Sequence, residues 1–284
     1  MLVLIGYAVV LFSVFGGFAL AGGHLASLLQ PVELLMIGGG AVGAFVVGNT
    51  GKSIKSTLKA LPSVFKGTKY SKDMYMELMA LLYELLGKVR KEGLMSIEAD
   101  VEVPAESAIF AKYPKVVADH HIVEFMTDYL RIMVSGNLNA MEIDNLMEIE
   151  IETHHHEAMG PSHIIAKMGD GMPAFGIVAA VMGVVHTMES VGMPPAELGL
   201  LIAHALVGTF LGILLGYGFV GPLASVLEQK AEESTKMLQT IKVTLLANLN
   251  GYAPAMAVEF GRKALNSTER PGFLELEEHV KQKR

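Results

Sequence analysis

The apolar stretch from Met172 to Leu227 constrains the fold of this chain more than any other feature. It contains no lysine or arginine, and its only acids, Glu189 and Glu197, flank a turn at residues 190–196. The second of the two apolar runs, Leu198 to Val220, is long enough at ~1.5 Å per residue to cross a hydrocarbon core of ~30 Å. We therefore predict a hairpin of two transmembrane helices.

Small residues predict that the two helices of this hairpin pack closely, because they allow backbones in a membrane to approach one another. The first run, Met172 to Met188, is short and needs neighbouring helices to span comfortably. Pro173 is expected to open the first helix and Pro222 to close the second, either as ordinary helix punctuation or as hinges. The small residues are Gly176, Ala179, Ala180 and Gly183 on the first run and Gly208, Gly212 and Gly216 on the second.

Two further apolar runs, Met1 to Gly23 and Pro31 to Gly48, predict two more membrane spans. Lysines become frequent after the second of them, whereas the linkers after the first and third spans have none. By the positive-inside rule, the segment after Asn49 and both chain termini are cytoplasmic. The lysines are Lys52, Lys55, Lys59, Lys66, Lys69 and Lys72.

The expected fold class is therefore an all-α membrane protein. It has four transmembrane helices, a large helical cytoplasmic insertion between spans 2 and 3, and a helical cytoplasmic C-terminal extension. The expected domains are a transmembrane hairpin at 1–49, a cytoplasmic helical domain at 50–170, a second transmembrane hairpin at 171–223, and cytoplasmic C-terminal helices at 224–284.

Apolar periodicity and turn residues predict the cytoplasmic helices. Gly93 should end the first of them, Ser96 should cap a short helix, and Glu84 and Lys88 stand at the spacing of an ion pair on one helix face. After Pro271 we expect a short charged tail. The predicted helices are Met74 to Arg90, Lys115 to Val134 with its end at Gly136, Ala140 to Glu157, Ala224 to Asn248, and Met256 to Leu265.

A membrane protein that carries ions usually holds a carboxylate within its spans. Here Glu33, Asp170, Glu189 and Glu197 all stand at or beyond the span ends, so a partner would have to supply that acid. His204 lies within the fourth span and is either a proton relay or a neutral imidazole that is hydrogen-bonded between helices. The hydroxyl of Thr209 either bonds the carbonyl four residues earlier, which the sequence favours, or lines a wet path.

The sequence contains little that indicates an enzyme, a metal site or a nucleic-acid-binding protein. The tract His154-His155-His156 is interpreted as a solvated helix end rather than a metal site, because consecutive helical residues point in different directions. We found neither a phosphate-binding loop nor a nucleophile motif, and the chain has no cysteine. We therefore expect no enzyme, no catalytic residue, no cofactor and no metal. A formal net charge of -7 argues against nucleic acid as a partner.

Several sequence runs resemble the flagellar stator subunits of the MotA/TolQ/ExbB family, and together they cover nearly the whole chain. The signature-like runs are residues 173–183 and 208–214, and further similar runs are 58–62, 128–131, 248–254 and 257–263. The resemblance implies a ring, thought to hold five copies, around two helices of a partner, MotB, whose aspartate carries the proton. It places the complex in the lipid of the bacterial inner membrane, at the flagellar basal body, where ion flow drives torque on the rotor protein FliG.

The resemblance also implies roles for particular residues. Arg90 and Glu98 would contact FliG, and Pro173 and Pro222 would couple protonation to movement of the cytoplasmic part. The ion path beside the partner's aspartate would be lined by Ala180, Thr209 and Tyr217. Sodium-driven relatives tend to carry threonine at the position of Ala180, so protons are the expected ion.

Three alternatives stay open at the level of sequence. One is a self-contained ion transporter that uses His204. Another is a TolQ/ExbB-like energy-transducing subunit, although those relatives have three spans rather than four. The third is a membrane scaffold that conducts no ions.

Overall fold

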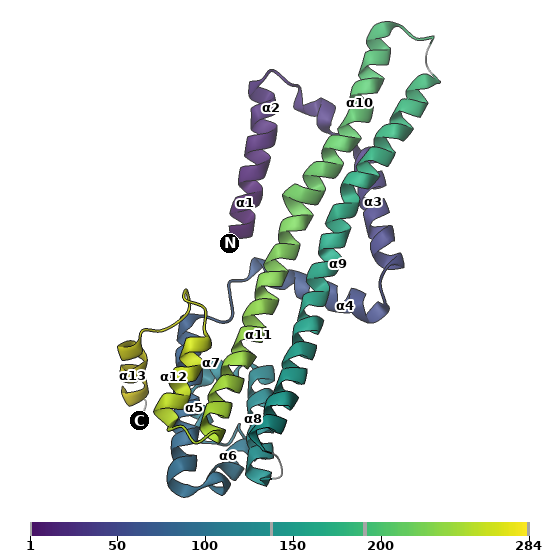
Figure 1. Cartoon of the computed structure of the whole chain (residues 1–284). Helices are drawn as coiled ribbons and strands as arrows, with labels where there is room; N and C mark the ends of the chain where they lie inside the picture. The colour runs from purple at the N-terminus through teal and green to yellow at the C-terminus, as the bar shows by residue number, and fades with distance from the viewer. Residues whose placement is uncertain (1, 137–138, 190–191, 283–284) are drawn as a thin grey trace. The chain divides into compact units, whose positions relative to one another are not determined.

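The computed structural model describes residues 2–136, 139–189 and 192–282, and within these ranges all regular secondary structure is helical (Figure 1). Contacts divide the chain into two compact units. Unit 1 comprises residues 1–67 and 158–230, and unit 2 comprises residues 68–157 and 231–284. The long helices α9 (Ala140–Met188) and α11 (Gly221–Leu249) each contribute residues to both units.

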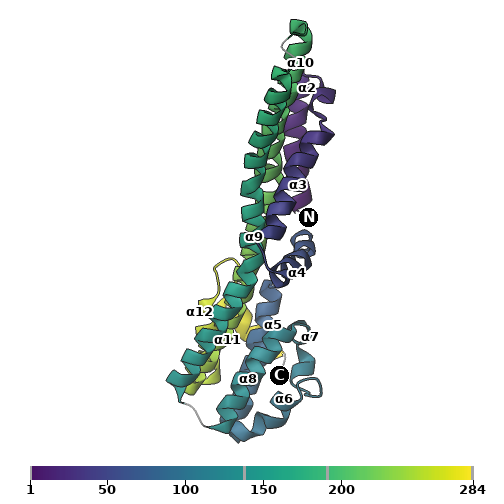
Figure 2. The same cartoon turned by 90° about the vertical axis from the view of Figure 1, so that its right-hand side faces the viewer.

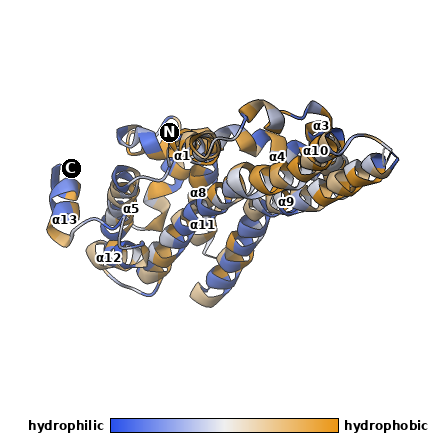
Figure 3. Ribbon diagram, turned by 90° about the horizontal axis from the view of Figure 1, so that it is seen from above, coloured by the Kyte–Doolittle hydropathy of each residue, from blue (hydrophilic) through white to orange (hydrophobic). Residues whose placement is uncertain are grey.

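Unit 1 contains the apolar helices. Among the described residues, four helices are long and apolar enough to cross a membrane: Leu2–Leu20, Leu25–Val47, Ala140–Met188 and Pro195–Leu249. Figure 3 shows the hydrophobic colour concentrated along α10 and the neighbouring part of α9. The predicted all-α class with four long apolar helices is confirmed.

The first two apolar helices pack against the hairpin that α9 and α10 form (Figures 1 and 2). The Tyr7 hydroxyl of α1 donates to the Phe219 carbonyl over 2.8 Å, and their rings lie 4.9 Å apart. Ile37 and Ala41 of α3 are buried in one apolar cluster with Ala179 and Val207. The helical segments of unit 1 before α9 are α1 (Leu2–Leu11), a π-helical segment at Phe12–Gly16, α2 (Gly17–Leu20), a 3-10 turn at Leu25–Leu28, α3 (Pro31–Val47), α4 (Gly51–Ala60) and a 3-10 turn at Leu61–Phe65.

Unit 2 is built around α5 (Lys72–Glu92), which is buried on most of its circumference. Its leucines form one core with residues from the first part of α9 and the last part of α11. The expected pair of Glu84 and Lys88 is not made: Glu84 pairs with Lys112, and Lys88 pairs with Asp100 over 2.8 Å. Around α5 lie α6 (Glu98–Glu102), α7 (Pro114–Val117), α8 (His120–Ser135), α12 (Pro254–Ala264) and α13 (Phe273–Gln282), with 3-10 turns at Leu94–Ile97 and Phe110–Lys112.

Several predicted boundaries in unit 2 were wrong. Ser96 does not cap α6; it lies in the preceding 3-10 turn, and its hydroxyl donates to the Gly93 carbonyl over 2.6 Å. The predicted helix 115–134 is divided at residues 118 and 119 into α7 and α8. The expected charged tail is the helix α13, because its Leu276 and Val280 are buried against the core. Gly93 and Gly136 do end their helices, both with positive φ.

The largest departure from the sequence prediction concerns the prolines. Pro173 does not open a helix, because α9 continues unbroken from Ala140 through Pro161 and Pro173 to Met188. Pro222 does not close one, because α10 (Pro195–Ile213) leads through a π-helical segment at Leu214–Val220 directly into α11. Of the predicted turn between α9 and α10, residues 190 and 191 lie outside the described residues.

The compact units and the predicted domains divide the chain at different residues. The units reflect contacts, with boundaries at 67/68, 157/158 and 230/231. The predicted boundaries at 49/50, 170/171 and 223/224 are the places where the chain is expected to leave the membrane, and they stay a prediction.

Candidate functional site

The close packing of α9 on α10 forms the centre of unit 1, and glycine makes it possible. A β-carbon at Gly176 would lie 2.7 Å from the Gly208 carbonyl oxygen and 3.0 Å from the Gly212 Cα. A β-carbon at Gly212 would lie 2.7 Å from the Met172 carbonyl oxygen, and one at Gly183 would lie 2.8 Å from the Ala205 Cβ. Such distances are too short for real side chains, so the predicted small-residue packing of the hairpin is confirmed.

Pro173 lies on this contact rather than at a helix end. A β-carbon at Gly216 would lie 2.9 Å from Pro173 Cδ and 2.6 Å from the Gly169 carbonyl oxygen. Gly169 is the residue whose carbonyl would accept the i-4 hydrogen bond that a proline cannot donate. The carbonyl to which Pro173 cannot donate therefore faces Gly216 across the hairpin.

Pro222 is accommodated by a local change of helix type. In the π-helical segment before it, the backbone N–H of Gly221 donates to the carbonyl of Gly216, five residues earlier. A wider register of this kind is one way in which a helix accommodates a proline. A β-carbon at Gly169 would lie 3.2 Å from the Gly221 nitrogen, so the backbones next to Pro173 and Pro222 meet at one level of the hairpin.

Ala180 and Thr209 lie at neighbouring places on the two helices. A β-carbon at Gly208, the residue before Thr209, would lie 3.2 Å from the Ala180 backbone nitrogen. Within the described residues the Thr209 hydroxyl makes no hydrogen bond, so the favoured bond to the Ala205 carbonyl is not formed. The other threonines in helix interiors do make this i-4 bond: Thr57, Thr127, Thr153, Thr187, Thr235, Thr240 and Thr244.

Tyr217 lies in the π-helical segment and is 61% exposed, so its phenol is available to a partner or to lipid. His204, one turn before Gly208, is half-buried. Its ring makes no hydrogen bond in the part of the chain that the structure describes, contrary to the interhelical bond that was one of its two interpretations.

Glu33 is the residue that sequence reasoning missed. It lies in the first turn of α3, as expected, but it is only 8% exposed, and its Oε2 finds no hydrogen-bond partner among the described residues. A β-carbon at Gly208 would lie 2.6 Å from that oxygen. The residue thus lies at the span end, but its side chain is buried in the helix packing. The burial of a carboxylate against a glycine on another helix leaves no signal in the sequence.

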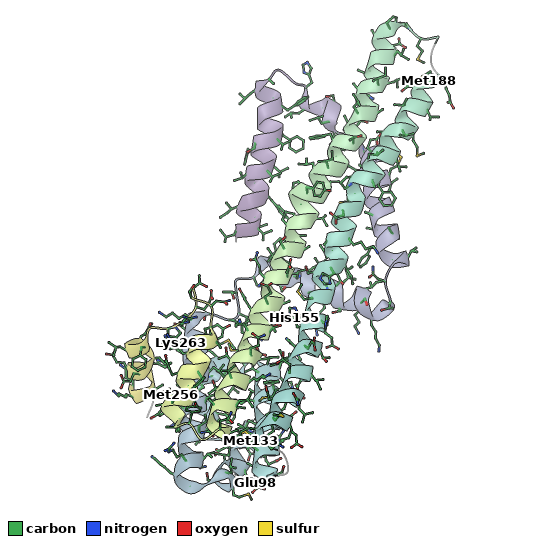
Figure 4. The ribbon with its side chains drawn as sticks, viewed as in Figure 1. Glu98, Met133, His155, Met188, Met256 and Lys263 are labelled. Carbon is green, nitrogen blue, oxygen red and sulfur yellow. The ribbon has the colours of Figure 1, made fainter. Side chains whose placement is uncertain are left out.

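Arg90 lies in the last turn of α5 and Glu98 begins α6, on either side of the 3-10 turn Leu94–Ile97. Both are exposed, and neither forms an ion pair within the described ranges. Lys88 and Asp100 hold the two segments together over 2.8 Å, and the Ser107 hydroxyl donates to Asp100 over 2.6 Å. Figure 4 shows Glu98 at the end of unit 2 where α6 lies. The ion pair between Lys88 and Asp100 holds the end of α5 to α6, and the opposite charges of Arg90 and Glu98 remain exposed.

The histidine tract lies inside α9, so the interpretation as a solvated helix end was wrong. His154 Nε2 lies 3.0 Å from the Ser234 hydroxyl, and His155 Nδ1 lies 3.1 Å from the Thr235 hydroxyl, both on α11. Burial, and then the charge of His121, lower the pKa of His154. No group of three metal-ligating side chains occurs in the described ranges. These histidines join two helices of unit 2.

Comparison with known proteins agrees with these features. The model for the motility protein A N-terminal region matches residues 4–93, and the model for the MotA/TolQ/ExbB proton channel family matches residues 117–240. The chain is 60% identical over 281 residues to motility protein A of Salmonella typhimurium strain LT2 and to that of Escherichia coli K12. Each match covers 99% of this chain and 95% of the relative.

A solved structure supports the same assignment. The structure of the flagellar MotAB stator complex from Bacillus subtilis matches with a TM-score of 0.74 and 27% identity. The match covers 90% of this chain and 92% of that chain. The chain therefore belongs to the MotA/TolQ/ExbB proton channel family, in the branch formed by the motility protein A subunits of flagellar stators.

Proposed function

We propose that this multi-pass stator subunit forms a proton path with the membrane helices of a MotB-type partner. The observation that carries the proposal is the free hydroxyl of Thr209 beside Ala180, in a hairpin whose only acids, Glu189 and Glu197, flank its turn. Ala180, Thr209 and Tyr217 line the path, and an aspartate of the partner carries the proton. As a channel-family motor subunit, the chain is not an enzyme.

Pro173 and Pro222 couple protonation to movement. Each lies inside a continuous helix that contributes residues to both units, so a bend at either proline changes the angle between the parts of that helix before and after it. The packing of Pro173 on Gly216 supports this proposal, because it places one proline against the helix that carries the other.

Arg90 and Glu98 form the contact with the rotor protein FliG. Their exposure without internal ion pairs supports this role, since charges displayed at a surface steer and orient a complementary partner. Torque on FliG is then delivered through unit 2.

The assembly is a ring of copies, five in number, around two partner helices in the bacterial inner membrane at the flagellar basal body. Both termini and the segments 50–170 and 224–284 are cytoplasmic, while 1–49 and 171–223 hold the membrane hairpins. The distribution of lysine supports this orientation, because Lys52, Lys55 and Lys59 follow the second span directly. The exposed apolar side chains Val181, Val185 and Leu206 are available to the partner, to other copies or to lipid.

The test is proton flux into liposomes that hold the chain with or without the MotB-type protein of the same organism. Flux is expected only with both proteins, and it should disappear when the partner's membrane aspartate is changed to asparagine. Flux without the partner would contradict the shared path.

A further inference from the structure

A cavity of about 490 Å³ opens between α3 and α9 in unit 1, away from the Ala180 and Thr209 contact. This volume is within the ~300–1,000 Å³ of ligand pockets in proteins. The lining of the cavity comes from α3 and the two residues after its end, including Ala41, Ala44 and Phe45, and from α9, including His163, Lys167 and Phe175.

The lining is graded from apolar to charged. At one end the Phe175 ring lies on Gly40, where a β-carbon would be 2.6 Å from the ring, and Phe45 and Ala41 continue the apolar surface. At the other end lie the exposed side chains of His163 and Lys167, one turn apart on α9. Asp170 is also there, so the charge of this end is mixed, and Lys167 is its one permanent cation.

The lysines of unit 1 share one property, which concerns ion pairs. Within the described residues none of them forms an ion pair with an acid, whereas most lysines and arginines of unit 2 do: Lys69, Lys72, Lys88, Lys112, Lys115, Arg131, Lys242, Arg262 and Lys281. Lys52 and Lys55 of α4 follow α3 directly, beside the charged end of the cavity in sequence. Unit 1 therefore presents cations without internal counter-charges at one end of its apolar helices.

We propose that the cavity between α3 and α9 binds an anionic phospholipid, with its phosphate at Lys167 and an acyl chain along Ala41, Ala44, Phe45 and Phe175. Each lysine near an anionic membrane surface contributes ~1 kcal/mol to the attraction of acidic headgroups, and basic pockets between membrane helices bind such headgroups. The apolar end of the cavity contacts the acyl chain of the lipid. A water-soluble anion has no acyl chain and would be held by the charged end alone.

The test uses the full chain in complex with its MotB-type partner, extracted in a non-ionic detergent. Native mass spectrometry counts the lipids that stay bound when phosphatidylglycerol and phosphatidylcholine are supplied in equal amounts. We expect retained phosphatidylglycerol in excess of phosphatidylcholine, and about a fivefold loss of it in Lys167→Gln. The matched control is Lys59→Gln, on α4 and outside the cavity, which should retain the lipid.

A second pair of variants tests the apolar end. Ala44→Leu fills the cavity and should reduce binding of both lipids, while Val46→Leu, at an exposed position of α3 outside the cavity, should not. Equal retention of the two lipids by the unchanged complex would overturn the proposal, as would equal loss in Lys167→Gln and Lys59→Gln.

Another copy of the chain could occupy the cavity instead. Because the chain has no cysteine, Ala44→Cys introduces a single thiol at the cavity wall. Disulfide-linked dimers through this thiol in the membrane, together with no retained lipid, would assign the cavity to a contact between copies. A thiol that reacts with a lipid-soluble maleimide and forms no dimer is the result that the proposal predicts.

Discussion

Pro173 packs directly on Gly216, and no side chain larger than hydrogen fits between the two helices at that point. The contact joins the two features that the proposed coupling depends on: a proline inside α9 and the π-helical segment that leads to Pro222. A larger residue at position 216 would push the helices apart at the level where both prolines lie.

Gly216→Ala should therefore destabilise the hairpin by about 1–3 kcal/mol, the usual cost of adding a methyl group to a packed contact. The measurement is thermal unfolding of the purified complex together with a swimming assay. Gly199→Ala is the matched control on α10, because a β-carbon there meets nothing within 4 Å. Equal stability and motility in both variants would show that the close contact is not needed.

Thr209→Val should reduce proton flux about five- to tenfold if its free hydroxyl lines the path, since one hydrogen bond contributes ~1–1.5 kcal/mol. Thr209→Ser keeps the hydroxyl and should retain flux. The control is Thr187→Val on α9, whose hydroxyl already donates to the Gly183 carbonyl over 2.8 Å. A larger loss of flux in the control than in Thr209→Val would remove Thr209 from the path.

Charge reversal at Arg90 and at Glu98 tests the proposed contact with the rotor protein. Arg90→Glu and Glu98→Lys should each weaken binding to FliG at least about tenfold, because juxtaposed like charges at an interface cost several kcal/mol. Motility should fall while proton flux through the complex is unchanged. Lys263→Glu changes another exposed charge, on α12 and far from Glu98 in Figure 4, and should swim normally. Normal motility with both Arg90 and Glu98 reversed would exclude this contact.

His154 of α9 is expected to make unit 2 sensitive to acid. The pKa of His154, which lies outside the predicted spans, is lowered by burial and by the charge of His121. Below its ordinary pKa of about 6.5 the unfolded chain therefore binds more protons than the folded chain, and stability falls as the pH falls from neutrality through this window.

This loss can be followed by amide hydrogen exchange in α9 and α11 within unit 2 between pH 7.5 and pH 5.5. His154→Gln should lose part of the pH dependence, and His120→Gln, at an exposed position, should keep it. Identical pH dependence in the wild type and in His154→Gln would assign the effect to other groups.

Much of unit 1 was predictable because membrane helices leave strong signals. The apolar runs gave the four helices, and the spacing of Gly208, Gly212 and Gly216 gave the face on which α10 meets α9. The prolines were misjudged for a physical reason. In a soluble helix Pro173 and Pro222 would end the element, but neighbouring helices and a π-helical register can satisfy or accommodate the backbone groups that a proline frees in a membrane.

The hydrogen bonds and the burial of individual side chains could not be predicted from the sequence. The Thr187 hydroxyl donates to the carbonyl four residues earlier whereas that of Thr209 does not, and the burial of Glu33 depends on a glycine of another helix. The tail after Pro271 is charged, yet Leu276 and Val280 dock it on α5 as a helix, which only the tertiary core decides.

The central claim is that the proton-carrying acid belongs to the partner. Its most direct test measures proton flux into liposomes with the chain alone, with the partner added, and with the partner's membrane aspartate changed to asparagine. We predict flux in the second preparation only. Flux from the chain alone, abolished by His204→Phe or by Glu33→Gln, would place the carrier within this chain and contradict the shared path.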